Sequence, residues 1–345
     1  MRPDTQSILS SPGLLQANRT GCERLATLFA DGELEHVFIL AGLQEYTEDA
    51  DSNWETWLDA SLDSLAGKTG QIQAPYVFQP GTEIEDYFIF RPLIINYNPR
   101  GVHFVDNLFG AEVFRMGDKS WQAHVLNTPI GELEPVDLDA LLAWRDMKQF
   151  TEAFLSRDVP GVYLGMPTIA SALNIAVNLY GQNILVALLE EPDAARHDLT
   201  VINDTLCRIH QWYIEHVPFD QLQCIIPDGR FQPPGSGQIC GCTTQLISSD
   251  LYRTFIAPLD DAMLSLYANG GMIHLCGCHT QHIPAWKEMK SLRAVQMNDR
   301  AAEDLTPFFA GLREDQIMYV NPCQKMPTNR VMSITKGRRL VLCRP

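Results

Sequence analysis

The stretch Gly270-Gly-Met-Ile-His-Leu-Cys-Gly277 has the pattern of a buried β-strand that carries two reactive side chains. Its apolar run is short enough for one strand, and glycines stand on both sides of it. His274 and Cys276 are two residues apart, so in a strand their side chains point to the same face. The stretch therefore predicts a strand that ends in an imidazole and a thiol on one side.

Similar apolar runs recur on both sides of this stretch and alternate with segments of helical periodicity. The predicted strands are residues 36–42, 102–109, 161–166, 222–226, 272–277, 292–297, 316–320 and 338–343. Helical patterns cover 138–155, much of 169–216, 250–268, 283–290 and 302–312. Eight strands in this order favour a closed parallel (β/α)8 barrel, the TIM barrel, over an open doubly wound sheet.

The amino-terminal part of the chain is less regular. Residues 1–35 predict an irregular leader followed by a helix around 19–30, and the apolar spacing at 53–65 predicts another helix. Residues 70–100 contain several prolines and glycines and indicate no clear element. No linker or repeat divides the chain, so we expect one α/β domain over residues 1–345, a TIM barrel with an N-terminal helical extension.

The composition limits the partners that this protein can have. The formal net charge is −16, which repels phosphate backbones and anionic lipids, so nucleic-acid and membrane-surface partners are not expected. No apolar run reaches the roughly 18 residues of a membrane span, and the first residues lack the apolar core of a signal peptide. We therefore expect a cytoplasmic protein whose nine cysteines are reduced.

The carboxyl ends of the strands of a parallel barrel meet at one mouth, where the chemistry takes place. The polar residues at the predicted strand ends are Asp106, Asp228, His274, Cys276, Asn298, Asp299, Asn321 and Cys343. Imidazole and thiolate are ligands that Zn²⁺ prefers, and three protein ligands leave a position open for substrate. The competing interpretation is that Cys276 is a small buried apolar residue and His274 a core histidine.

Under the zinc interpretation His274 and Cys276 are two of the ligands, and Cys343, which closes the last predicted strand, is a candidate for the third. Cys323, Cys278 and His279 are alternative third ligands. The pair in Cys240-Gly-Cys242 is expected to line a strand near the pocket more often than to bind metal.

The chain also resembles a known superfamily. The stretch from Ser249-Asp-Leu-Tyr-Arg-Thr-Phe-Ile-Ala-Pro258 through Gly277 is similar to the uroporphyrinogen decarboxylase superfamily, in particular to its zinc-dependent methyltransferases. Gly101-Val-His-Phe-Val-Asp-Asn-Leu-Phe-Gly-Ala-Glu-Val113 resembles the family's second strand, and Gly161–Pro167, Leu179-Tyr-Gly181 and Glu191-Pro192 resemble its third strand and following helix. The resemblance covers roughly residues 20–343.

The resemblance implies a TIM barrel and a zinc-bound thiol that exchanges a methyl group with a corrinoid carried by a partner protein. It assigns the zinc ligands to His274, Cys276 and Cys343. Two departures stand against a full match. The arginines that bind substrate carboxylates in the decarboxylase are absent from Phe38-Ile-Leu-Ala-Gly-Leu-Gln-Glu-Tyr46, and Leu342 replaces the glycine that precedes the last cysteine of the methyltransferases.

Three hypotheses remain. In the first, a zinc thiol methyltransferase, Asp228, Asn298 or Asp299 orients the ligand imidazole or the substrate. In the second, a metal-free lyase acts through Asp106, which matches the decarboxylase aspartate. In the third, a non-catalytic member binds a ligand or a corrinoid protein. The expected partners are a small-molecule thiol or methyl donor, a corrinoid protein, and a second copy of the chain in a homodimer.

Overall fold

Two parallel sheets form the centre of the computed structural model, which describes residues 1–49, 53–78, 84–117, 120–224 and 230–344. One sheet has the strand order β3-β1-β13-β12-β11-β10-β9 and the other the order β2-β4-β7-β8. The strands are β1 (Val37–Leu40), β2 (Leu43–Thr47), β3 (Tyr87–Phe90), β4 (Leu93–Tyr97), β7 (Val162–Gly165), β8 (Leu222–Gln223), β9 (Gly237–Cys240), β10 (Gly271–Leu275), β11 (Leu292–Met297), β12 (Ile317–Val320) and β13 (Leu340–Cys343).

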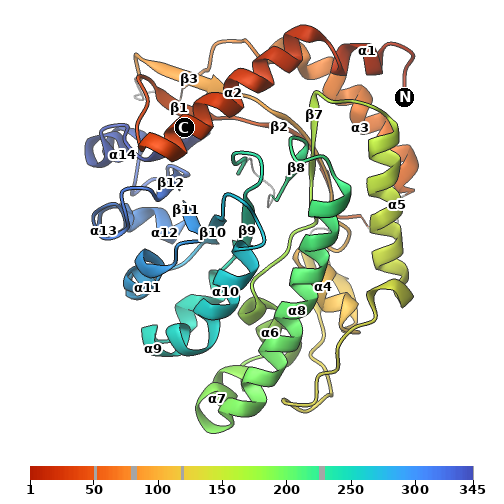
Figure 1. The fold of residues 1–345 in the computed structure, drawn as a ribbon, viewed down its shortest axis with the longest axis vertical. Helices are drawn as coiled ribbons and strands as arrows, with labels where there is room; N and C mark the ends of the chain where they lie inside the picture. Colours follow the sequence, from red (N-terminus) through yellow and green to blue (C-terminus); the bar gives the residue numbers. More distant parts are fainter. Residues whose placement is uncertain (50–52, 79–83, 118–119, 225–229, 345) are drawn as a thin grey trace.

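The two sheets are joined where the chain passes from β1 into β2 and from β3 into β4. β1 pairs with β3 in the first sheet, and β2 pairs with β4 in the second. The backbone N–H groups of Ala41 and Leu43 continue the ladder across the break by donating to Phe90 and Pro92. At the other edge, Ala170 forms a parallel bridge with Cys240 on β9. The strands thus surround a common interior, with the helices outside them (Figure 1).

The helices follow the strands in the order expected for an α/β protein. They are α1 (Thr5–Leu9), α2 (Pro12–Asp31), α3 (Trp54–Lys68), α4 (Phe104–Leu108), α5 (Leu142–Ser156), α6 (Ala172–Tyr180), α7 (Asn183–Glu190), α8 (Pro192–His216), α9 (Ser249–Leu251), α10 (Ala257–Leu264), α11 (Ile283–Glu288), α12 (Arg300–Glu303), α13 (Leu305–Gly311) and α14 (Thr328–Thr335). An antiparallel pair, β5 (Val113–Met116) and β6 (Ser120–Ala123), stands apart from the two sheets. In the described part of the chain, no single helix is long and apolar enough to cross a membrane.

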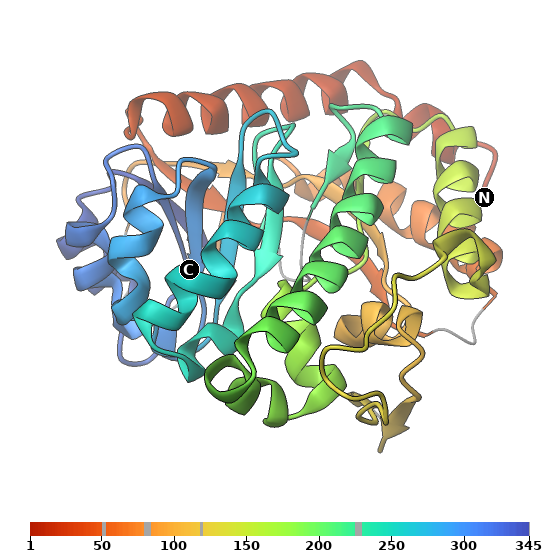
Figure 2. The same ribbon diagram turned by 60° about the horizontal axis from the view of Figure 1, so that its bottom comes forward.

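The predicted N-terminal helical extension is present as α1 and α2. Pro12 begins α2, where its missing N–H costs nothing, and Gly32 ends it in the left-handed conformation. In Figure 2, α2 runs across one side of the molecule as the red helix. Leu25, Leu28 and Phe29 of this helix pack on side chains of the strands, so α2 covers one end of the interior.

Neighbouring residues of β10, β11 and β12 belong to two different apolar clusters. Met272, Ala294 and Tyr319 pack with α2 in the inner cluster, whereas Ile273 and Val295 pack with the outer helices. Because successive strand residues point to opposite faces, residues in phase with Met272 face the interior. On β10 this places His274 on the interior face, at the carboxyl end of the strand.

The predicted strand over residues 102–109 is wrong. That segment forms a 3₁₀ turn (Gly101–His103) followed by α4. The backbone turns at Arg100 and Gly101, which have φ of 65° and 56°, and the buried Phe104 and Leu108 have helical spacing. The strands in this part of the fold are β3 and β4, within residues 70–100, for which no element was predicted. Of the predicted strand 222–226, β8 comprises the first two residues, and 225–226 lie outside the described residues.

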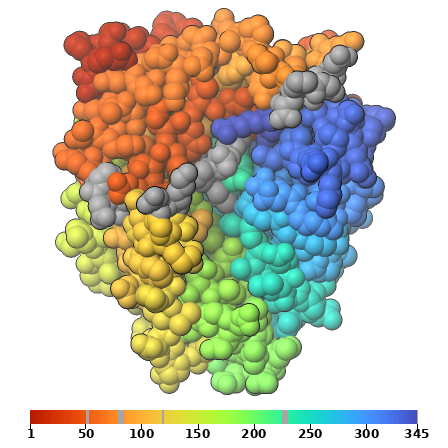
Figure 3. Space-filling view, turned by 180° about the vertical axis from the view of Figure 1, so that it is seen from behind, coloured from red at the N-terminus to blue at the C-terminus, as the bar shows by residue number. Residues whose placement is uncertain are grey.

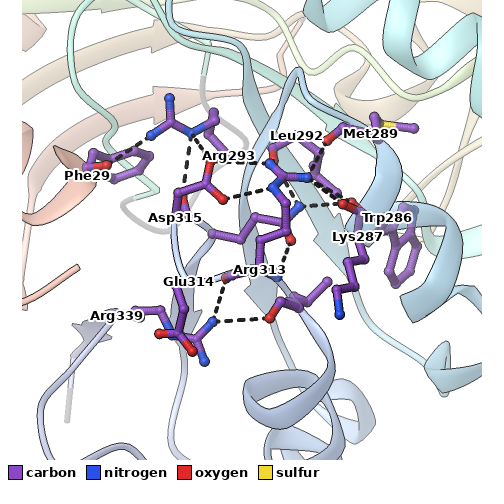
Figure 4. A network of polar contacts seen from close by, with 12 residues as sticks. Phe29, Trp286, Lys287, Met289, Leu292, Arg293, Arg313, Glu314, Asp315 and Arg339 are labelled. Atoms are coloured by element: carbon purple, nitrogen blue, oxygen red, sulfur yellow. Dashed lines mark hydrogen bonds and ion pairs between the residues drawn. The ribbon is translucent and has the colours of Figure 1, made fainter. Parts of the chain in front are cut away.

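Three arginines hold the amino ends of the last strands in place (Figure 4). Arg313 donates to the carbonyl groups of Lys287, Met289 and Leu292 at 2.8, 2.8 and 3.0 Å and pairs with Asp315 at 2.8 Å. Arg339 donates to the carbonyl of Arg313 at 2.6 Å, and Arg293 donates to the carbonyl of Phe29 on α2 at 2.9 Å. These charged donors satisfy carbonyl groups that helix and strand ends leave unpaired.

The first and last strands of the chain lie side by side. β1 pairs with β13 in parallel, with Phe38 opposite Val341 and Leu40 opposite Cys343. Figure 3 shows the consequence at the surface, where the orange N-terminal segments border the blue C-terminal segments. The inner residue Cys343 therefore belongs to the same interior as His274, although the two lie on different strands.

Candidate metal centre

The ends of β9 and β10 bring three thiols and an imidazole together. The strand register places Cys240 opposite His274. His274 Nε2 lies 3.1 Å from Cys276 Sγ, Cys276 Sγ lies 3.2 Å from Cys242 Sγ, and Cys242 Sγ lies 3.4 Å from Cys240 Sγ. The ligand atoms of Cys240, Cys242 and His274 all lie within 4.8 Å of one another. Cys276 is not in that group and adjoins it through its contacts with His274 and Cys242. The four residues are called the Cys3His cluster below.

Two glycines allow the chain to bring these side chains so close. A Cβ atom on Gly241 would lie 2.5 Å from Ile273 Cδ1, and one on Gly277 would lie 1.8 Å from Gln245 Oε1. Both distances are far below van der Waals contact, so a side chain at either position would have to displace Ile273 or Gln245. The glycines of Cys240-Gly-Cys242 and of the stretch after Cys276 therefore leave room for these two side chains.

Hydrogen bonds fix the orientation of the His274 ring. Its Nδ1 atom bonds to Gln296 Oε1 on the neighbouring strand β11, and Gln296 Nε2 donates to Asn321 Oδ1 at 2.7 Å. Because an amide oxygen only accepts, Nδ1 donates this hydrogen bond. The other ring nitrogen, Nε2, faces Cys276.

The thiols of the cluster differ in their affinity for protons. The hydrogen bond from Cys242 lowers the pKa of Cys276 to about 5 against the effect of burial, and His274 lowers it further. The hydrogen bond from Cys242 also lowers the pKa of Cys240, to about 6. Hydrogen bonds with Cys240 and Cys276, together with burial, raise the pKa of Cys242. Cys240 and Cys276 are therefore the more acidic thiols of the cluster, and Cys242 is the least acidic.

The donor set of the cluster fits zinc. The close group offers two cysteine sulfurs and one histidine nitrogen, which are ligands that tetrahedral Zn²⁺ prefers, and soft sulfur donors disfavour Mg²⁺ and Ca²⁺. Each of the three cysteines is partly exposed as a residue. His274 is buried, with a bonded partner behind its ring.

The predicted third ligand, Cys343, lies apart from the cluster. It faces the same interior, but the group of ligand atoms within 4.8 Å of one another does not include it. Complete burial raises the pKa of its thiol to about 12, which keeps it protonated. Among the alternative third ligands, Cys278 is exposed, Cys323 pairs through its backbone with Met326, and His279 Nδ1 bonds to Thr244 Oγ1 at 3.0 Å.

Asp106 occupies a second polar site near the cluster. Its Oδ2 atom bonds to His103 Nδ1 at 2.6 Å and accepts from Asn178 Nδ2 at 2.9 Å. Burial raises the pKa of this carboxyl group, although the hydrogen bond from His103 partly opposes the shift. Asn178 lies on α6 one turn from Asn174, whose Nδ2 atom is 3.6 Å from Cys240 Sγ. One helix thus contacts both sites.

The other predicted catalytic residues are placed differently. Asp228 lies outside the described residues. Asn298 is partly buried, and its backbone N–H donates to the carbonyl of Leu275 on β10. Asp299 is exposed and has φ of 47°, a conformation that is strained for a residue with a side chain. The residue that bonds to the imidazole of His274 is Gln296, for which the sequence contains no signal.

Two further members of the cluster, Cys240 and Cys242, were expected to line the pocket and not to bind metal. A signal for them exists in the sequence, because Cys240-Gly-Cys242 has the same two-residue spacing as His274-Leu-Cys276. The spacing does not predict the strand register, which places Cys240 opposite His274.

Comparisons with known proteins show a shared fold. No protein-family model matches the chain, and no curated protein matches it. Among solved structures, a methyltransferase from Methanosarcina mazei superimposes with a TM-score of 0.61, covering 92% of this chain and 90% of that chain, at 11% sequence identity. The chain therefore has the overall fold of that protein, with a possible metal-binding group of cysteine and histidine at its strand ends.

Proposed function

We propose that this protein is a zinc-dependent methyltransferase that moves a methyl group between a corrinoid and a small-molecule thiol. The observation that carries the proposal is the Cys3His cluster at the carboxyl ends of two adjacent parallel strands. Strand ends of this kind carry the chemistry of parallel α/β folds. The fold shared with a methyltransferase supports the reaction class.

The proposal includes a single (β/α)8 barrel over residues 1–345. Pairing of the first strand β1 with the last strand β13 supports ring closure, as does the continuity of β1 with β2 and of β3 with β4. The bridge from Ala170 to Cys240 links the remaining edge. In such a barrel the cluster would lie inside the mouth, where substrates enter.

Zinc held by this cluster would keep a coordinated thiol as thiolate at neutral pH, which makes it a nucleophile toward a methyl group. His274 would bind through Nε2 while Gln296 holds the opposite side of its ring. Cys240 and Cys276 would bind as the thiolates that their lowered pKa values favour. Arg230, which is buried, adds positive charge that lowers the pKa of Cys276 further.

The remaining partners belong to the same proposal. Val102, which follows β4, and Leu246, which follows β9, are exposed apolar side chains. Exposed apolar side chains there favour a protein partner, which we take to be the carrier of the corrinoid. The proposal places the protein in the cytoplasm, as a homodimer, without nucleic-acid or membrane partners, in line with its net charge of −16.

The test is metal analysis of protein purified without chelators. The wild type is expected to hold one zinc per chain, and His274→Ala combined with Cys276→Ala is expected to hold none while remaining folded. Cys278→Ala is the matched control, because Cys278 is an exposed thiol outside the cluster. Methyl transfer from methylcobalamin to ethanethiol is then measured as the loss of the methylcobalamin absorption spectrum. A wild type without zinc would remove the basis of the proposal.

A second candidate, a metal-free lyase acting through Asp106, is favoured by one observation. Asp106 is fully buried, and its Oδ1 atom has no hydrogen-bond partner among the described residues. A carboxyl group held in this way can bind N–H groups of a ligand. Asp106→Asn separates the candidates, because a lyase would lose its activity whereas zinc content and methyl transfer would persist. Absence of both activities from the folded wild type would favour a non-catalytic binding protein.

A further inference from the structure

A small cavity lies at the end of the strands opposite to the Cys3His cluster. It has a volume of about 150 Å³ and lies between the carboxyl end of α8, the amino ends of β8 and β9, and the segment that follows α10. The candidate metal centre, in contrast, lies at the carboxyl ends of β9 and β10. What the cavity binds therefore does not depend on the proposed function.

The walls of the cavity are largely apolar. Leu222 at the start of β8 and the aromatic residues Phe219 and Tyr267 are among the residues that line it. The described residues that line it include no charged side chain. A charged ligand would lose its hydration there without gaining a counter-ion, so the cavity favours a neutral molecule.

Three apolar side chains around the cavity remain exposed to solvent. Ile214 is 37% exposed, Phe219 60% and Leu266 37%. They belong to two separate segments of the chain and line the same cavity. Single exposed apolar residues are common on protein surfaces, but a group of them around one cavity is typical of a binding site.

One polar side chain in the wall has no partner. Ser236 lines the cavity and is 6% exposed, and its Oγ atom has no hydrogen-bond partner among the described residues. The hydroxyl group of Tyr267, in contrast, bonds to His210 Nδ1 at 2.5 Å and accepts from Cys224 Sγ at 2.9 Å. A buried hydroxyl group without a partner is rare and costs free energy, so Ser236 indicates a hydrogen bond to a bound molecule.

The backbone holds Ser236 in place from both sides. The carbonyl of Gly235 accepts from the backbone N–H of Asn269 at 3.0 Å, and the N–H of Gly237 donates to a carbonyl just before β10 at 2.8 Å. A Cβ atom on Gly235 would lie 2.3 Å from Phe219 Cε2, so the Phe219 ring lies directly on this glycine. The wall beside Ser236 is therefore formed before any ligand binds.

We propose that this cavity binds a small neutral aromatic molecule with one hydroxyl group, a phenol. An apolar cavity of about 150 Å³ has room for one benzene ring. The rings of Phe219 and Tyr267 favour an aromatic ligand, because aromatic pairs attract one another beyond the burial of their area. Ser236 Oγ can donate or accept a hydrogen bond, and the hydroxyl group of the ligand is its partner.

The experiment titrates the full-length protein with phenol and follows ¹³C-labelled isoleucine and leucine methyl groups by NMR. We expect saturable shifts of the methyl signals of Ile214, Leu222 and Leu266, which line the cavity. Absence of saturable shifts at these three residues would overturn the proposal. Shifts of the same signals when the protein is diluted without phenol would show that a second copy of the chain covers the cavity, which would also overturn it.

Ser236→Ala tests the hydrogen bond to the ligand. The variant loses a hydroxyl group that has no partner among the described residues, so it is expected to fold. Its affinity for phenol should fall by about threefold to tenfold, whereas its affinity for benzene, which has no hydroxyl group, should not fall. Unchanged affinity for phenol, or an equal loss for both compounds, would refute the role of Ser236 and the ligand class with it.

Two further comparisons test the aromatic ring and the place of binding. Cyclohexanol should bind the wild type about threefold or more weakly than phenol, and equal affinity would refute an aromatic ligand. Ala268→Trp adds a large side chain to an exposed wall residue and should abolish the shifts with phenol. Ala262→Trp is the matched control, because Ala262 is an exposed residue of α10 that is not among the residues lining the cavity. Phenol binding that persists in a folded Ala268→Trp variant would overturn the proposal.

Discussion

Replacing Gln296 by leucine would test how His274, a proposed metal ligand, is held. Gln296 is fully buried on β11, where Oε1 accepts from His274 Nδ1 and Nε2 donates to Asn321 Oδ1 at 2.7 Å. Leucine has a similar volume but neither donates nor accepts a hydrogen bond. The imidazole keeps its space and loses the partner that sets its tautomer, so we expect weaker zinc binding by a protein that still folds.

The size of the effect follows from the burial of the atoms involved. Loss of an outer partner of a metal-binding histidine lowers metal affinity by about 10–100-fold, or about 1.4–2.7 kcal/mol. His274 is 5% exposed, so its Nδ1 atom would lack a partner in a buried place, which costs about 1–3 kcal/mol of unfolding free energy. Asn321 is partly exposed, so water can replace the bond that it loses.

Zinc affinity is measured by competition with a chromophoric chelator, and the free energy of unfolding of the metal-free protein by urea titration. Gln316→Leu is the matched control, because Gln316 is also fully buried and donates to the carbonyls of Trp286 and Leu292 at 2.9 Å each, remote from the cluster. It should lower stability similarly and leave zinc affinity unchanged. A folded Gln296→Leu variant with the zinc affinity of the wild type would refute the reasoning.

Three further predictions concern the frame around the site. Arg313→Met removes the donor to several carbonyl groups and should lower the unfolding free energy, measured by urea titration, by about 3 kcal/mol. The control Arg253→Met loses an exposed ion pair and should lower it by less than about 1 kcal/mol. Burial raises the pKa of Asp260 from 3.8 to about 7, so its contribution to the unfolding free energy is complete below pH 3.8 and is lost as the pH rises through about 7. Asp260→Asn should remove this decline of the unfolding free energy, measured by urea titration across the same pH range. An unchanged pH dependence in the variant would contradict the prediction. Cys343→Ala should keep one zinc per chain by metal analysis, since the thiol lies outside the cluster, and a zinc-free variant would restore Cys343 as a ligand.

Much of the carboxyl-terminal half of the fold could be predicted from the sequence. The run 292–297 coincides with β11, the predicted strands at 316–320 and 338–343 each contain one observed strand, and 272–277 overlaps β10 (Gly271–Leu275). These strands are largely buried on both faces, so their sequences are mainly apolar, as is typical of a parallel sheet. The runs are also bounded by glycine or polar residues, which limits where each strand ends.

The amino-terminal half was harder to predict for a physical reason. The apolar pattern of residues 102–109 is compatible with a strand or a helix. In the structure, the backbone at Arg100 is left-handed and turns the chain, and α4 follows the turn. β3 and β4 are separated by Pro92, which has no N–H for the ladder, so each is too short to stand out. β9 is also short; it supplies Cys240, and Cys242 is the second residue after it.

The sequence alone determined that His274 and Cys276 share one face of a strand, because side chains in a strand alternate with a period of two. The apolar runs of the later strands, which alternate with helical segments, also indicated a parallel sheet. Only the tertiary structure decided which thiols join these two residues. The β9–β10 register sets Cys240 opposite His274, and β11 supplies Gln296 behind the ring. Such pairings join residues far apart in the chain, and local spacing does not encode them.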